Sequence, residues 1–189
     1  MKKFGIFLLF ILISPLLSGL YGIIHDQITY SISIEYFTKF KFYQFGLMDQ
    51  GNEAIFTNPR YQVSIIGFMA TWWLGIPIGI LLGIEGLRYK KAKDMFSATF
   101  KAILITILVA VLGGIIGFAY GHFYLINRPI EEFSTWYIPN NITDLNSFIE
   151  VGTIHNFSYV SGIIGLLVAL IYSSIKRKRT NRMLVDNQE

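Results

Sequence analysis

Four long apolar stretches constrain the fold of this chain more than any other feature of its sequence. They cover about residues 4–24, 63–87, 102–126 and 157–175, and each is long enough to cross a hydrocarbon core, which takes roughly 20 residues of helix. Inside lipid the backbone must satisfy its own polar groups, so the stretches are predicted to be helices. Charged residues make up only 15% of the chain, against about 25% in soluble proteins. The sequence therefore predicts an all-α membrane protein: one membrane domain, residues 1–189, built as a four-transmembrane-helix bundle.

The basic residues predict how this bundle is oriented. Twelve of the sixteen Lys and Arg side chains precede the first stretch or lie in the connection 88–101 and the tail 176–189. The loops 25–62 and 127–156 hold the other four, together with eight of the twelve acidic residues. Basic residues gather on the cytoplasmic side of a membrane. We therefore expect a multi-pass protein of the bacterial inner membrane, with both termini in the cytoplasm and the two loops outside.

Small residues recur at four-residue spacing and predict close helix packing. The first stretch carries Ser14, Ser18 and Gly22, which favours a retained anchor over the alternative of a cleaved signal peptide. Such rows let helix backbones approach closely in lipid, so a tight bundle is expected, with a dimer face or sliding surface as alternatives. Similar rows occur at Gly75, Gly79 and Gly83, at Gly113, Gly117 and Gly121, and at Gly162, Gly165 and Ala169.

The first outer loop, residues 25–62, carries an alternating pattern. From Ile28 to Tyr36 apolar residues alternate with polar ones, a period of two that is typical of a half-buried strand. A second alternation covers residues 39–42. We therefore expect a strand or an irregular hairpin lying over the outer end of the bundle.

Histidines and acids at the outer ends of the predicted helices are the candidate functional residues. Imidazole and carboxylate groups are suitable ligands for Zn, Cu, Fe or Mn, so convergence of these side chains would make a transition-metal site. A haem held by two histidines, a proton-handling His25–Asp26 pair and purely structural hydrogen bonding are the alternatives. The candidate metal ligands are His25, Asp26, Glu35, His122 and His155.

Several other chemistries receive little support from the sequence. The chain has no cysteine, which excludes disulfides and thiolate metal sites. It has no nucleophile-elbow or phosphate-loop motif; a metal-free hydrolase would need a serine paired with a histidine, and no spacing selects one. No apolar stretch has a charged residue near its centre, which disfavours an ion pump or a secondary transporter.

Four short motifs resemble a pattern found in bacterial multi-pass membrane proteins of unknown function. They are His25-Asp26-Gln27-Ile28-Thr29, Glu35-Tyr36-Phe37-Thr38, Ala70-Thr71-Trp72-Trp73-Leu74-Gly75 and His155-Asn156-Phe157-Ser158-Tyr159. The resemblance covers the first two helices, the first outer loop and the start of the fourth helix. It implies no mechanism, but it singles out His25, Asp26, Glu35 and His155, whereas His122 lies outside it.

The leading functional hypothesis is a polar site at the outer mouth of the bundle, with side chains suited to bind a transition metal. The first alternative is a scaffold or accessory subunit that docks a membrane-protein partner, or a second copy, through residues 25–62. The second is a small-solute channel or transporter, which would require a continuous polar lumen. We also expect anionic lipids to bind the basic tail, and no nucleic-acid partner.

Overall fold

The structure is a computed structural model that describes residues 2–186, and within this range it contains helices and no strands. Four helical stretches are long and apolar enough to cross a membrane: α1, α3 continued through η2 into α4, α5, and α6. The prediction of an all-α membrane protein with four long apolar helices is confirmed at this level. The elements are α1 (Lys2–Ile32), the π-helical turn η1 (Tyr36–Lys41), α2 (Phe42–Gln44), α3 (Pro59–Thr71), the short turn η2 (Trp72–Leu74), α4 (Gly75–Leu87), α5 (Ala92–Phe123), the short turns η3 (Leu125–Asn127) and η4 (Ile130–Phe133), and α6 (Leu145–Asp186).

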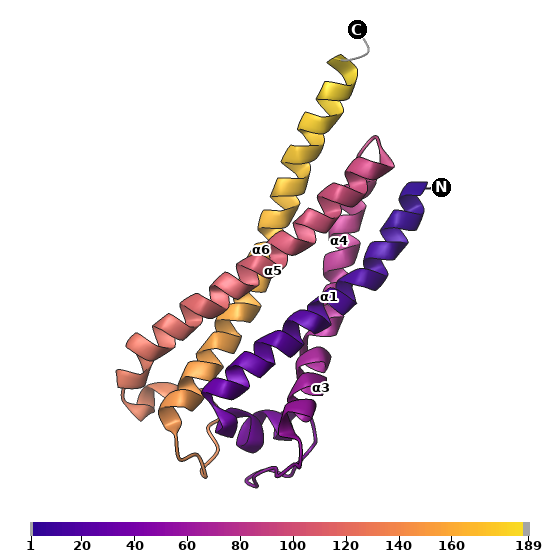
Figure 1. The fold of residues 1–189 in the computed structure, drawn as a ribbon. Helices are drawn as coiled ribbons and strands as arrows, with labels where there is room; N and C mark the ends of the chain where they lie inside the picture. Colours follow the sequence, from indigo (N-terminus) through magenta and orange to yellow (C-terminus); the bar gives the residue numbers. More distant parts are fainter. Residues whose placement is uncertain (1, 187–189) are drawn as a thin grey trace.

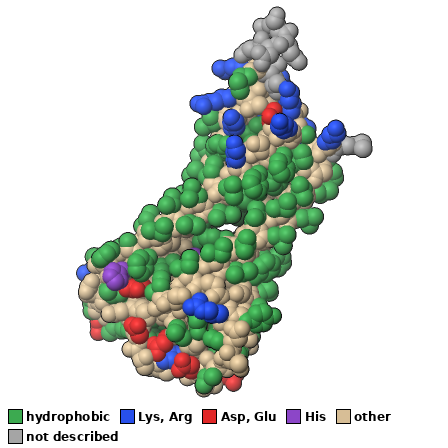
Figure 2. Space-filling view, viewed as in Figure 1, with side chains coloured by type: hydrophobic (Ala, Val, Ile, Leu, Met, Phe, Trp, Pro, Cys, Tyr) green, Lys and Arg blue, Asp and Glu red, His purple; other side chains and the backbone are tan. Residues whose placement is uncertain are grey.

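The two ends of the bundle differ in what they carry. Both chain termini lie at one end, which we call the terminal end (Figure 1). The connections 33–58 and 124–144 lie at the other, which we call the histidine end. Between the two ends the surface is dominated by hydrophobic side chains, and Lys and Arg side chains gather at the terminal end (Figure 2).

The long helices pack as two pairs. α5 runs along most of α6, α1 runs along α3 and α4, and contacts between the pairs are sparser. Both pairs are closely packed: an added Cβ at Gly22 of α1 would lie 2.0 Å from the carbonyl oxygen of Gly67 in α3. In the other pair, a Cβ at Gly113 of α5 would lie 2.0 Å from Oγ of Ser161 in α6. The sparser contact between the pairs leaves room for the cavity described below.

The prediction of a strand over residues 28–42 is wrong. α1 continues to Ile32, and η1 and α2 follow after a short break. The buried residues of this region recur at helical spacing, at Asp26, Thr29, Tyr30 and Ser33. Ile28, by contrast, is 59% exposed. The strand prediction failed because it assumed that the alternating apolar residues face a protein core. In a membrane helix, apolar residues also face lipid.

The helices are longer than the apolar stretches that revealed them. The predicted spans 4–24 and 157–175 lie inside α1 and α6, which continue well past them at the histidine end. The loops predicted as 25–62 and 127–156 are therefore shorter, because their first or last turns are helical. His25 and His155 consequently lie inside helices and not at helix ends.

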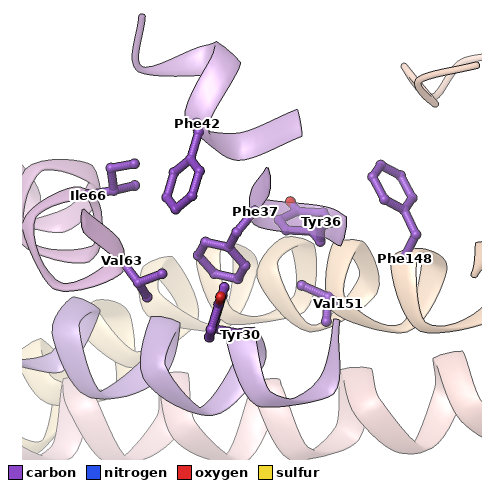
Figure 3. Close-up of a cluster of buried hydrophobic side chains, with 8 residues drawn as sticks. All are labelled: Tyr30, Tyr36, Phe37, Phe42, Val63, Ile66, Phe148 and Val151. Atoms are coloured by element: carbon purple, nitrogen blue, oxygen red, sulfur yellow. The ribbon is translucent and has the colours of Figure 1, made fainter. Parts of the chain in front are cut away.

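A cluster of buried aromatic and aliphatic side chains covers the histidine end (Figure 3). Tyr36 and Phe37 of η1 and Phe42 of α2 pack against residues of α1, α3 and α6. This packing fixes η1 over the bundle and thereby places the side chain of Lys41, the last residue of η1. The other members of the cluster are Tyr30, Val63, Ile66, Phe148 and Val151.

Candidate functional site

Asp26 of α1 lies at the centre of a buried polar cluster. Its side chain contacts those of Lys41 from η1, His155 from α6 and its neighbour His25. Asp26 is 2% exposed, Lys41 3% and His155 4%. A carboxylate so deeply buried needs an opposite charge and hydrogen-bond donors to remain ionised. The cluster supplies both.

Lys41 is the cation of this cluster. Its Nζ lies 2.8 Å from Oδ1 and 2.7 Å from Oδ2 of Asp26, and 2.8 Å from Nε2 of His155. Nζ also lies 5.2 Å from the centre of the Phe37 ring. Burial lowers the pKa of Lys41 from its ordinary value, and the Asp26 carboxylate opposes that change. The ammonium therefore has its partners within the protein and does not depend on water.

The hydrogen bonds of His155 determine which of its ring nitrogens carries the proton. Nδ1 lies 2.9 Å from the carbonyl oxygen of Val151, one turn earlier in α6. A carbonyl only accepts, so Nδ1 carries the proton and Nε2 accepts a hydrogen bond from Lys41. The separation of 3.3 Å between Nε2 and Asp26 Oδ1 is then a contact between two acceptors, with the Lys41 ammonium beside both. His155 thus helps to hold Lys41 against Asp26.

His25 links the carboxylate to a serine on another helix. Its Nδ1 lies 3.3 Å from Oδ1 of Asp26, and its Nε2 lies 3.1 Å from Oγ of Ser158 in α6. Since a carboxylate only accepts hydrogen bonds, Nδ1 carries the proton, and Nε2 of the neutral ring accepts from the Ser158 hydroxyl. The chain Ser158–His25–Asp26 has the order of nucleophile, base and orienting carboxylate that activates a serine. Separations slightly above 3 Å are usual for such groups without substrate.

A cavity of about 210 Å³ opens beside this chain of groups, and we call it the central cavity. Tyr21, His25, Asp26 and Ser158 lie along part of its wall. The Tyr21 hydroxyl oxygen is buried and has no hydrogen-bond partner among residues 2–186. Its ring centre lies 5.6 Å from that of His25. An unpaired donor beside a serine and a histidine is suited to stabilise an oxyanion.

Two of the five predicted metal ligands do not join the cluster. Glu35 lies at the N-terminus of η1, where its carboxylate accepts hydrogen bonds from Lys39, from the Thr143 hydroxyl, and from the backbone amides of Thr143 (2.8 Å) and Asp144 (2.9 Å). His122 of α5 is paired through Nδ1 with Oε1 of Glu150, at 2.7 Å. Glu35 therefore joins η1 to the segment before α6, and His122 joins α5 to α6.

Glu35 provides a pH-dependent contribution to stability. Burial alone would raise its pKa, but hydrogen bonds from the Asp144 amide, Lys39 and Thr143 lower the pKa to about 2 from 4.5. A lowered pKa stabilises the fold above about pH 4.5, and this stabilisation is lost as the pH falls toward 2. We expect Glu35→Gln to cost on the order of 1 kcal/mol at pH 7 and to flatten the pH dependence between 4.5 and 2. Unfolding in detergent at a series of pH values measures both, with exposed Glu131→Gln as control; equal slopes for wild type and Glu35→Gln would contradict the assignment.

The remaining three candidates, His25, Asp26 and His155, do come together. One potential ligand atom from each lies within 4.8 Å of the others, which is compatible with a metal ion. The Lys41 ammonium, however, contacts both Asp26 and His155. A divalent ion bound by these donors would have to displace it, because two cations cannot share the position without strong repulsion.

Lys41, Ser158 and Tyr21 were absent from the predicted site. Lys41 carried a signal, since it is one of the few basic residues outside the basic segments of the terminal end. Ser158 carried a weaker one: it follows His155 by three residues, so the two share a face of α6. No sequence signal indicated Tyr21, because its candidate role depends on its hydroxyl having no hydrogen-bond partner among the described residues.

Comparison of the chain with protein-family models, with curated proteins and with solved structures gives no match. The functional argument therefore rests on the geometry of the cluster and the cavity.

Proposed function

We propose that this chain is a membrane-embedded serine esterase whose reactive groups are Ser158 and His25. The observation that carries the proposal is the continuous chain from Ser158 Oγ through both nitrogens of His25 to Asp26. Asp26, Lys41 and His155 are positioning residues: they hold the His25 ring with its proton on Nδ1, so that Nε2 is free to act as a base.

The proposal assigns a side chain near the central cavity to each step of ester hydrolysis. Ser158 Oγ attacks the ester carbonyl carbon while His25 Nε2 takes the hydroxyl proton, and the Tyr21 hydroxyl donates to the carbonyl oxygen as it becomes negative. The C–O bond to the alcohol then breaks, and the alcohol leaves with the proton from His25. A water molecule repeats the sequence on the acyl-serine, releases the acid and restores Ser158.

A second cavity, of about 430 Å³, is lined by residues that include Lys41, His155, Asn156 and Tyr159. Tyr159 lines both this cavity and the central cavity. The proposal assigns the entry of water to this second cavity and the apolar part of the substrate to the central cavity.

The same proposal includes the location of the protein in the cell. Lys and Arg gather at the terminal end (Figure 2), which supports a cytoplasmic position for both termini and an extracytoplasmic position for the histidine end. We place the chain in a bacterial inner membrane, with the basic tail against anionic lipids. The mainly apolar lining of the central cavity does not favour the alternative of a polar channel.

A transition-metal site at His25, Asp26 and His155 is the second candidate function, favoured by the separation of their donor atoms. It requires Lys41 to move away. Metal analysis of the purified protein distinguishes the two proposals: stoichiometric Zn, Cu, Fe or Mn that is lost in His155→Ala supports the metal site. Esterase activity that persists in the presence of a chelator supports the serine site.

Covalent labelling tests the esterase proposal. A fluorophosphonate reacts with a serine only when a neighbouring base activates it, so we expect wild-type protein in lipid vesicles to be labelled. Ser158→Ala should lose the label, and Ser161→Ala, changed three residues further along α6 where the serine packs on Gly113, should keep it. Labelling that is equal in all three proteins, or absent from folded wild type, would reject Ser158 as the nucleophile.

A further inference from the structure

The central cavity has the distribution of polarity expected for one amphiphilic molecule. Its titratable groups and Ser158 gather where α1 and α6 carry Tyr21, His25 and Ser158. The rest of its wall is mainly apolar, although it includes the hydroxyl-bearing residues Ser14, Ser18, Thr71 and Thr106. Along α1 the lining residues extend from Asp26 back to Ser14, which corresponds to about 18 Å of helix. The cavity therefore runs from the reacting groups toward the middle of the membrane. The aliphatic lining residues include Leu74, Ile78, Ile103, Ile107 and Leu166.

Water is a poor occupant of the aliphatic part of this cavity. Apolar cavities of about 150 Å³ remain dry in proteins and accept apolar molecules instead. Ser14 has a buried hydroxyl without a hydrogen-bond partner among the described residues. The hydroxyls of Ser18, Thr71 and Thr106 already donate to backbone carbonyl groups, so this part of the cavity offers water few free polar partners, whereas a buried water needs two to four. A hydrocarbon chain meets the requirements of this lining.

The cavity is accessible from the lipid side. A second hollow, of about 540 Å³, lies between α1 and α5, and we call it the lipid-facing groove. The groove and the central cavity share Tyr21, His25 and Ile107 as lining residues, so they meet at the catalytic histidine. On α6, Ile163 lines the central cavity and is 67% exposed. An opening among the hydrophobic side chains is visible near the middle of the molecule in Figure 2.

We infer that the substrate is a lipid ester of the surrounding membrane, whose acyl chain enters sideways between the two helix pairs and fills the central cavity. The ester carbonyl then lies at Ser158, and the alcohol part of the lipid points toward the histidine end. This inference rests on the proposed esterase for its chemistry, whereas binding of the chain follows from the cavity alone.

Gly162 of α6 gives a way to fill the cavity from within. It lines the central cavity, and a Cβ added there would meet no atom within 4 Å. Gly5 of α1 is a matched control: it is also a helical glycine with nothing within 4 Å of an added Cβ, and it lies near the terminal end. Both positions have open space for an added Cβ, so Gly162→Leu and Gly5→Leu differ in whether the new side chain occupies the central cavity.

The kinetic experiment compares a long-chain and a short-chain ester. For Gly162→Leu we expect kcat/KM with p-nitrophenyl palmitate to fall at least about 10-fold more than kcat/KM with p-nitrophenyl acetate. Gly5→Leu should match wild type with both esters. Leu74→Trp, which narrows the cavity from the opposite wall, is expected to repeat the pattern if Gly162→Leu does not fold. Equal effects on both esters, or none on palmitate, would overturn the inference.

A binding experiment separates this inference from the esterase proposal. In phosphatidylcholine vesicles, a palmitic acid carrying a photoreactive diazirine near its chain end should cross-link to cavity residues around Ile103 or Leu166. The cross-link should persist in Ser158→Ala and be lost in Gly162→Leu. Cross-linking without hydrolysis would reject the esterase and keep the acyl-chain site; hydrolysis of both esters without cross-linking in the cavity would reject the acyl-chain site and keep the esterase.

Discussion

His25→Ala is expected to lower kcat for ester hydrolysis by about 10⁴-fold or more, because the serine loses its base. His25 is the only group that contacts both the Ser158 hydroxyl and the Asp26 carboxylate among the described residues. In a nucleophile–base pair, removal of either member costs nearly as much as removal of both. We therefore expect His25→Ala, Ser158→Ala and the double variant to have similar residual rates.

His122→Ala is the matched control for this prediction. His122 is a histidine at the same end of the bundle, but it is bonded to Glu150 and has 46% of its side chain exposed. We expect its replacement to leave kcat within the error of the measurement. The test compares steady-state rates of p-nitrophenyl acetate hydrolysis by wild type and the two histidine variants in vesicles. Similar losses of rate for both variants would indicate an effect on folding. A wild-type rate for His25→Ala would exclude His25 from the mechanism.

Lys41→Met is expected to have the largest effect on stability, about 3–5 kcal/mol of unfolding free energy. The substitution removes the ammonium that contacts both oxygens of Asp26 and leaves a carboxylate buried without a cation. His25 still donates one hydrogen bond to Asp26, which does not replace a charge. The loss should be measured by reversible unfolding in detergent near neutral pH.

Two further variants show whether this loss comes from the buried charge. In Lys41→Met/Asp26→Leu both charges are absent, so most of the stability should return, although hydrolysis should remain impaired because His25 has lost its orienting partner. Lys39→Met, two residues earlier in η1, removes a lysine that is also buried, but its partner Glu35 is less deeply buried than Asp26. Glu35 also keeps its hydrogen bonds from Thr143 and Asp144, so we expect a clearly smaller loss of stability than for Lys41→Met. A double variant as unstable as Lys41→Met would contradict the account, as would a Lys41→Met protein that recovers full stability by binding zinc.

The helical architecture could be predicted from the sequence because the lipid bilayer leaves the backbone few other ways to satisfy its hydrogen bonds. Runs of apolar residues long enough to span a bilayer leave few alternatives to helices, and residues 2–186 contain four such helices. The wrong prediction of a strand over residues 28–42 also has its cause in the membrane, where apolar side chains can face lipid instead of a protein core. Ile28, Ile34 and their neighbours alternate with polar residues, but the buried positions at Thr29 and Ser33 are polar ones, held by hydrogen bonds inside the protein.

The candidate site was predicted only in part because its chemistry depends on tertiary contacts. His25, Asp26 and His155 could be named because histidines and acids are few in this chain. The role of Ser158 could not be recognised, because it depends on α6 approaching α1 closely enough to bring a hydroxyl 3.1 Å from His25. Lys41 is separated from Asp26 by fifteen residues, and only the turn of the chain through η1 returns its ammonium to the carboxylate.

The central claim is that Ser158 becomes acylated during turnover, and trapping that intermediate tests it most directly. Wild-type protein is mixed with p-nitrophenyl acetate, quenched in acid within the first turnovers and digested for mass spectrometry. The account predicts an acetyl group on Ser158 in wild type and no acetylated peptide from this segment in Ser158→Ala. Hydrolysis that proceeds while Ser158 stays unmodified, with or without acetylation of another residue, would contradict it.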